Sequence, residues 1–89
     1  MMTREEAMRI IEEEELRHYN LFEEHGPRKW DLGIKKRGSQ WVVYKVDERW
    51  AIWPETEQYF DTENEAWDCF IDRLRASKEL EELTQGKYY

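Results

Sequence analysis

The sequence has few of the residues that build covalent or metal-bound cores. Its 89 residues include one cysteine, Cys69, with four glycines and two prolines. A single cysteine excludes a disulfide within the chain and a thiolate metal cluster. Cys69 is expected to pack as a small apolar residue, because no histidine partner for a nucleophile is apparent. These features indicate a protein of a reducing compartment.

Long apolar segments are also missing. The N-terminal stretch lacks the apolar core of a signal peptide, and no apolar run approaches transmembrane length. We therefore expect a soluble cytoplasmic protein with no membrane partner. The length predicts a single domain over residues 1–89, with a short C-terminal tail from about residue 84.

Motifs that carry chemistry are absent as well. No glycine-rich loop is present to cradle phosphate, and no loop has the spacing of calcium ligands. Glu15 and His18 have the Glu-x-x-His spacing of di-metal helical bundles, but the second copy is missing. The sequence therefore predicts no enzyme activity, no cofactor and no metal site.

Aromatic and charged residues are what the chain has in abundance. Five tryptophans, five tyrosines and three phenylalanines make a small core efficient, and some of them should reach the surface. Residues 1–25 carry three basic and eight acidic residues, residues 26–49 carry seven and three, and residues 50–89 carry four and ten. The net charge of −7 thus combines acidic flanks with a basic middle, and it argues against general affinity for nucleic acid, because phosphate would be repelled over most of the surface.

Hydrophobic periodicity predicts an α+β domain of order α-β-β-β-α. Thr3 and Glu6 form a capping-box pattern before a helix over Arg4–Glu24, which Gly26-Pro27 would end. Thr62 and Glu65 repeat that pattern before a helix over Glu63–Leu83. Between the helices, alternation predicts a three-stranded antiparallel meander with strands over Lys29–Lys36, Gln40–Val46 and Trp50–Trp53. The pattern also allows a short edge strand over Gln58–Phe60.

Two tight turns would decide which side chains share a sheet face. With Arg37-Gly38 as the first turn, Ile34 pairs with Trp41. With Asp47-Glu48 as the second, Val43 pairs with Ile52, although a one-residue bulge would change this. The predicted core face holds Leu32, Ile34, Trp41, Val43, Trp50 and Ile52. The second face holds Asp31, Lys35, Val42, Tyr44, Ala51 and Trp53.

The second face is a candidate binding surface, because apolar side chains at its centre are ringed by charges. Two structural alternatives stay open. The two helices could pack on opposite sides of the sheet, or the Tyr88-Tyr89 tail could fold over this face.

The element order invites comparison with the double-stranded-RNA-binding domain. That family contacts phosphates with a basic start to its last helix. Here the matching segment, residues 62–65, is acidic, which argues against that activity. A basic aromatic surface from Arg28, Lys35, Arg37 and Trp53 could still stack single-stranded bases, so a small nucleic-acid-binding or regulatory module is the alternative hypothesis.

Several short patterns resemble the immunity protein 59 family. They are E-E-A-x-x-I-I-E-E-E from Glu5, Y-x-L-F-E-E-H-G from Tyr19, W-V-V-Y from Trp41, D-E-R from Asp47 and F-D-x-x-x-E-A from Phe60. The family comprises small α+β proteins of bacterial polymorphic toxin systems. The resemblance, over about residues 4–80, implies a non-enzymatic protein that neutralises a cognate toxin by direct binding.

An acidic inhibitor would associate quickly with the basic cleft of a nuclease toxin. The candidate partner-binding carboxylates are Glu12, Glu13, Glu23, Glu24, Glu55 and Glu57. Tyr44 and Trp53 are the candidate aromatic anchors, because binding energy concentrates in such residues.

Overall fold

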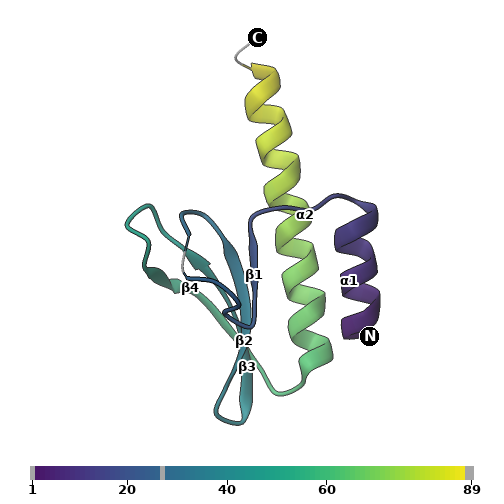
Figure 1. Cartoon of the computed structure of the whole chain (residues 1–89), viewed down its shortest axis with the longest axis vertical. Coiled ribbons are helices and arrows are strands. Elements are labelled where there is room, and N and C mark those ends of the chain that lie inside the picture. The colour runs from purple at the N-terminus through teal and green to yellow at the C-terminus, as the bar shows by residue number, and fades with distance from the viewer. Residues whose placement is uncertain (1, 27, 88–89) are drawn as a thin grey trace.

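The computed structural model describes residues 2–26 and 28–87, with side chains described as far as residue 80. Two helices and a four-stranded mixed sheet confirm the α+β class (Figure 1). The order is α-β-β-β-β-α, one strand more than predicted. The elements are α1 (Arg4–Glu13), β1 (Tyr19–Leu21), β2 (Leu32–Arg37), β3 (Gln40–Val46), β4 (Ile52–Phe60) and α2 (Glu63–Lys87). Neither helix, over its described residues, has the length and apolar character needed to cross a membrane.

Helix α1 begins as predicted and ends eleven residues early, at Glu13 instead of Glu24. The Thr3 side chain accepts the Glu6 N–H at its start. At its end, the Leu16 N–H donates to the Ile11 carbonyl (3.0 Å) and the Glu15 N–H to the Glu12 carbonyl (3.3 Å). With Glu15 at φ 52°, this is a Schellman motif that uses a glutamate where glycine is usual.

The released segment forms β1, an edge strand that the sequence did not predict. It runs parallel to β2, with Tyr19 opposite Leu32 and Leu21 opposite Ile34. β1 and β2 are consecutive in the chain and run in the same direction. The loop of residues 22–31 therefore leads from the end of β1 back to the end of the sheet where both strands begin. This loop lies beside the sheet face that the helices leave free.

The hairpin of β2 and β3 confirms the predicted distribution of side chains between the two faces. Its turn is one residue later than expected, at Gly38-Ser39, so Ile34 lies opposite Val43 instead of Trp41. Gly38 has a φ of 63°, which glycine adopts without strain. The shift moves each pair by two positions, which preserves the faces of β2 and β3.

The prediction for the last strand was wrong in register and length. Trp53 lies opposite Lys45 and Gln58 opposite Val43, so β4 advances by five residues where β3 advances by two. The Thr56 hydroxyl fills the gap by accepting the Lys45 N–H (2.9 Å). This irregularity absorbs Pro54, which is tolerated because β4 is an edge strand.

The loop between β3 and β4 also changes the predicted core. Ile52 packs with the second-face residues Val42, Tyr44 and Val46. Trp50 lies in the preceding loop with 59% of its surface exposed. Both residues were predicted on the core face, and both assignments were wrong because residues 47–51 form a five-residue loop instead of a two-residue turn. Trp50 lies in this loop, and Ile52 lies opposite Val46, an odd shift of three positions that exchanges the faces.

Helix α2 is longer than predicted and extends well beyond the sheet (Figure 1). The Thr62 side chain accepts the Glu65 N–H (3.3 Å) at its start, as the capping-box pattern predicted. The helix continues through Gly86 to Lys87, so the predicted tail from residue 84 is helical as far as it is described. Tyr88 and Tyr89 lie outside the described residues, which leaves the tail-covering alternative without a test.

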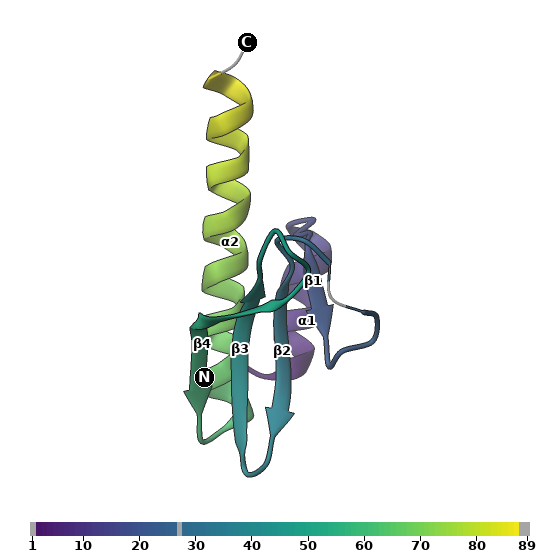
Figure 2. The same ribbon diagram turned by 90° about the vertical axis from the view of Figure 1, so that its left-hand side faces the viewer.

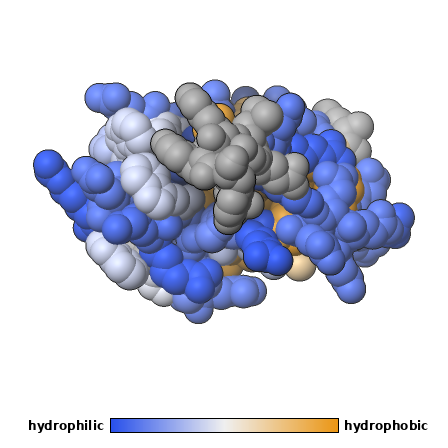
Figure 3. Space-filling view, turned by 90° about the horizontal axis from the view of Figure 1, so that it is seen from above, coloured by the Kyte–Doolittle hydropathy of each residue, from blue (hydrophilic) through white to orange (hydrophobic). Residues whose placement is uncertain are grey.

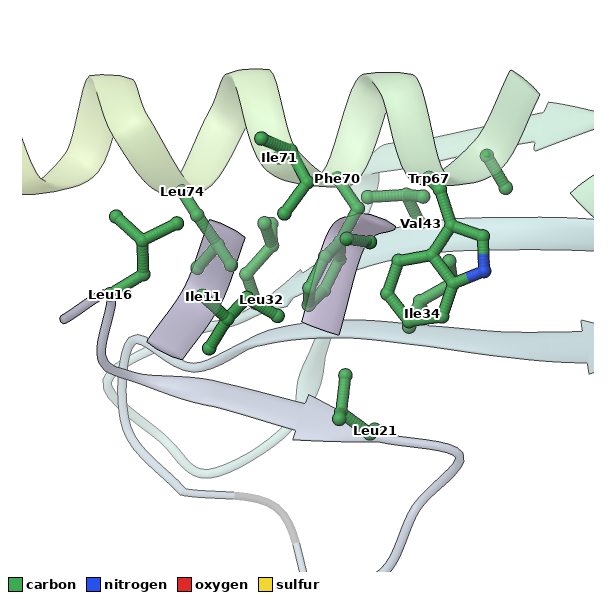
Figure 4. Close-up of a cluster of buried hydrophobic side chains, with 12 residues drawn as sticks. Ile11, Leu16, Leu21, Leu32, Ile34, Val43, Trp67, Phe70, Ile71 and Leu74 are labelled. Atoms are coloured by element: carbon green, nitrogen blue, oxygen red, sulfur yellow. The ribbon is translucent and has the colours of Figure 1, made fainter. Parts of the chain in front are cut away.

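Both helices cover the same face of the sheet, which rules out the alternative that they sandwich it (Figure 2). Trp67, Phe70 and Leu74 of α2 project toward the sheet, where Ile34 and Val43 meet them (Figure 4). Trp67 packs edge to face on Phe22 and Phe70, with ring centroids 6.0 and 5.4 Å apart. The buried core is Ala7, Ile11, Leu16, Leu21, Leu32, Ile34, Val43, Ala66, Trp67, Phe70, Ile71 and Leu74.

Ion pairs join the two helices at both ends of their interface. The Arg4 guanidinium donates to both carboxylate oxygens of Glu63 (2.7 and 3.0 Å), and holds the pKa of Glu63 below its ordinary value. At the other end, Arg75 donates to both oxygens of Glu14 and likewise lowers its pKa. Lys78 donates to the Glu14 carbonyl. Positive charge from α2 thus stabilises the C-terminus of α1.

Candidate binding surfaces

The second face of the sheet is built around one tyrosine. Asn20, Gly33 and Tyr44 are aligned across β1, β2 and β3. The Tyr44 ring lies over Gly33, where an added Cβ would come within 2.2 Å of its Cζ. Tyr44 is therefore only 2% exposed, and burial raises the pKa of its hydroxyl to about 12.

The loop after β1 forms a fixed rim beside this face. The buried Asn20 amide donates to the His25 carbonyl (2.9 Å) and accepts the His25 N–H (3.5 Å). Phe22 and Glu23 both have a left-handed backbone, with φ of 55° and 57°. Phe22 packs against the core residues Trp41 and Trp67, whereas Glu23 forms an ion pair with Lys35. These anchors hold the loop from both sides.

Together, the loop and the sheet enclose a hollow of about 480 Å³, which we call the second-face hollow. Its apolar lining comes from the ends of β3 and β4, and its polar lining from β1 and the loop. The lining residues are Asn20, Glu23, Glu24, His25, Gly26, Tyr44, Val46 and Ile52.

A polar cluster lies between this hollow and the end of the sheet. The nearly buried Asp31 carboxylate accepts a hydrogen bond from Arg28 Nε (3.1 Å). Arg28 Nη2 lies 2.8 Å from His25 Nε2, and His25 Nδ1 lies 2.8 Å from the Gly26 carbonyl. His25 Nε2 also lies 3.2 Å from the Tyr19 carbonyl and 3.7 Å from the Asp31 carboxylate. The cluster fixes the loop against β2.

Three exposed tryptophans surround the end of the sheet where β1, β2 and β4 begin, and we call this the tryptophan end. Trp30, Trp50 and Trp53 are 47%, 59% and 39% exposed. The backbone N–H of Trp30 donates to the Val46 carbonyl, and Lys45 Nζ lies 5.7 Å from the centroid of the Trp30 ring. Seen from above (Figure 3), pale side chains of intermediate hydropathy gather among hydrophilic ones over the side of the molecule that holds the sheet.

Trp30 and Trp50 share an unusual backbone conformation, each with a φ of 67°. A bulky side chain rarely adopts this region, which costs about 1–3 kcal/mol. Trp50 lines a second hollow of about 390 Å³ with His18, Arg28, Lys29 and Asp31. The strained backbone thus presents two large aromatic rings to solvent at one place.

The structure divides the sequence-predicted partner-binding residues among four places. Glu23, Glu24 and Tyr44 come together at the second-face hollow. Trp53 lies at the tryptophan end. Glu12 and Glu13 are exposed on α1, on the far side of the sheet, and Glu55 and Glu57 lie on the edge strand β4, where Glu57 pairs with Arg37 (2.8 Å).

The prediction left the exposure of the second face open, and the structure answers it residue by residue. Val42 and Tyr44 are buried, so Tyr44 presents no ring surface to a partner, while Trp53 stays accessible. Trp30, Trp50, Asn20 and His25 were not among the predicted site residues. Trp30 and Trp50 could have been found as aromatic residues bordering turns, but their left-handed backbone leaves no signal in sequence.

Comparisons of the chain with protein-family models, with curated proteins and with solved structures find no match. Across residues 2–26 and 28–87, no three histidine, cysteine, aspartate or glutamate side chains are grouped so as to hold a metal ion. The function is therefore inferred from the surfaces of the protein itself, which combine exposed aromatic rings with a charged hollow.

Proposed function

We propose that this protein is a non-enzymatic inhibitor that binds and neutralises a cognate bacterial toxin, as an immunity protein does. The observation that carries the proposal is the tryptophan end. Exposed tryptophans held at a strained backbone are poorly explained by folding, since burial would stabilise the domain more. Tryptophan is enriched among the residues that dominate protein interfaces.

The distribution of charge supports the same proposal. The exposed α1 residues Glu12 and Glu13 form no ion pair with any described residue, so they add to the acidic field of the helical side. Such a field accelerates association with a basic partner. An acidic inhibitor of a nuclease toxin would use it for steering and the aromatic rings for affinity.

The test is capture of the product of the gene adjacent to this protein's own, which we expect to be a toxin domain, followed by variants of the tryptophan end. Trp50→Ala and Trp53→Ala should each raise the dissociation constant at least tenfold, as expected of interface anchors. Because Trp50 is 59% exposed and Trp53 keeps 39% of its surface in solvent, the melting temperature should change by no more than about 3 °C. The matched control is Met8→Ala, which removes an exposed apolar side chain from α1 and should bind like the wild type.

Two results would contradict the proposal. One is a toxin domain that binds neither the wild type nor any variant. The other is a large loss of stability in the tryptophan variants, which would show that these side chains serve the fold.

A second candidate function rests on the basic residues beside the tryptophans. Arg28 and Lys29 precede Trp30, and Lys45 lies against its ring. Cationic and aromatic side chains in this arrangement stack single-stranded bases. Strong, salt-sensitive retention on a phosphate column would favour this candidate over the inhibitor, for which we expect elution at low salt.

A further inference from the structure

We infer that the second-face hollow receives the side chain of an arginine or lysine from the partner protein. This inference rests on the proposed function and specifies the chemistry of the partner.

The floor of the hollow suits the aliphatic stem of a basic side chain. Ile52 is half-buried and gives the hollow its accessible apolar surface, next to the buried Tyr44 and Val46 of the same small apolar cluster. Arginine and lysine bury their methylene groups against such surfaces while the charged head stays at the rim. A short polar side chain would leave this floor without a partner.

The charges around the hollow leave a negative excess. Lys35 neutralises Glu23, and Arg28 neutralises Asp31 beneath the loop. Glu24 is exposed and forms no ion pair within the described part of the chain, so its carboxylate is the free charge. An anionic group would be repelled here, whereas a guanidinium or ammonium group would be attracted.

The rim is organised before any partner binds. The Asn20–His25 clamp, the Lys35–Glu23 pair and the packing of Phe22 hold residues 22–25 in one conformation. The two left-handed residues in this turn are strained, and strained backbones gather at binding sites. A rigid rim lowers the entropy that binding costs, which favours a specific contact.

The hollow can be tested without the partner by using side-chain analogues on the full chain. We would titrate n-butylguanidinium, n-butylammonium and the neutral n-pentanol, and follow backbone amide shifts by NMR. The cations should give saturable shifts at residues 23–26, Tyr44, Val46 and Ile52, with pentanol binding more weakly. A preference for the guanidinium or the ammonium would distinguish arginine from lysine.

Glu24→Gln should weaken the binding of the favoured cation about threefold, the size expected for one exposed ion pair. Glu5→Gln is the matched control, because it removes an exposed carboxylate from α1 and should leave the binding unchanged. The amide spectrum of each variant reports whether it is folded.

The inference is overturned if the shifts do not saturate, if pentanol binds as well as the cations, or if Glu24→Gln binds like the wild type. These results are independent of toxin capture. A hollow that binds the cations while no toxin domain binds would contradict the proposed function alone, and the reverse would overturn this inference alone.

Discussion

At the scale of single residues, the second face depends on a glycine, because only a residue without a side chain fits under Tyr44. Gly33 lies under the Tyr44 ring, and a Cβ at this position would displace the ring or the backbone. We expect Gly33→Ala to destabilise the domain by about 2 kcal/mol, the usual cost of overpacking, which would lower the melting temperature by roughly 10 °C. Thermal unfolding followed by circular dichroism measures this.

Gly26→Ala is the comparison for that experiment. An added Cβ at Gly26 meets nothing within 4 Å, so the melting temperature should stay within about 3 °C of the wild type. Equal stability of the two variants would show that Tyr44 does not lie over Gly33 as described.

The sequence predicted those residues whose roles depend on near neighbours. Thr3 and Thr62 cap the two helices as expected, since the cap and its N–H are three residues apart. The burial of Tyr44 could not be predicted in the same way, because it requires a glycine on the neighbouring strand. The left-handed Trp30 and Trp50 were missed for the same reason, because the surrounding structure imposes their conformation.

At the scale of elements, the largest error concerns the end of α1. The pattern placed Tyr19 and Phe22 on a continuing helix, and Gly26 offered an obvious stop. The real stop is a Schellman motif with Glu15 at the left-handed position. Leu16 supplies the accompanying apolar contact with Ile11, since both lie in the core.

Glu15→Gly should therefore stabilise the domain. Glycine adopts the left-handed conformation without the steric cost of a side chain, and the gain is partly offset by its greater freedom in the unfolded chain. The expected net gain is about 0.5–1 kcal/mol, or a few degrees in melting temperature.

Glu13→Gly provides the opposite control two residues earlier. It places glycine inside the last turn of α1, where it should destabilise by about 1 kcal/mol. If both variants lost stability, α1 would have to continue past Glu13 as the sequence first suggested.

The sheet was predicted well wherever pairing is regular. The faces of β2 and β3 follow from alternation alone, and a turn displaced by one residue did not disturb them. Alternation failed at β4, where the bulge and the Thr56 side chain replace regular pairing. The candidate site was only partly predictable for a related reason, since β1 and its loop are what bring Glu23 and Glu24 to Tyr44.

At the scale of the whole molecule, the two helices are tied together by charge, which predicts sensitivity to acid. Hydrogen bonds from Arg4 and Trp67 stabilise the Glu63 carboxylate and lower its pKa from the ordinary 4.5. A lowered pKa contributes stability above the unfolded value, and that contribution is lost as the pH falls through the folded value.

Glu63→Gln should thus cost about 1 kcal/mol at pH 7, and the difference from the wild type should shrink toward pH 3. Melting temperatures measured over that range give the comparison. Glu79→Gln removes an exposed carboxylate from α2 and should show no such trend. A constant difference at all pH values would mean that Glu63 acts through packing alone.

The shapes of β1 and β4 have a consequence for how copies of the protein behave toward one another. Every open sheet has two edges whose unpaired N–H and C=O groups invite a strand from another chain. Here one edge is a strand of three residues, and the other is interrupted by Pro54 and by the Thr56 hydroxyl, which takes up a main-chain donor. Neither edge offers the long, straight template on which aggregates grow, so the addition of a strand from a second copy is disfavoured at both edges.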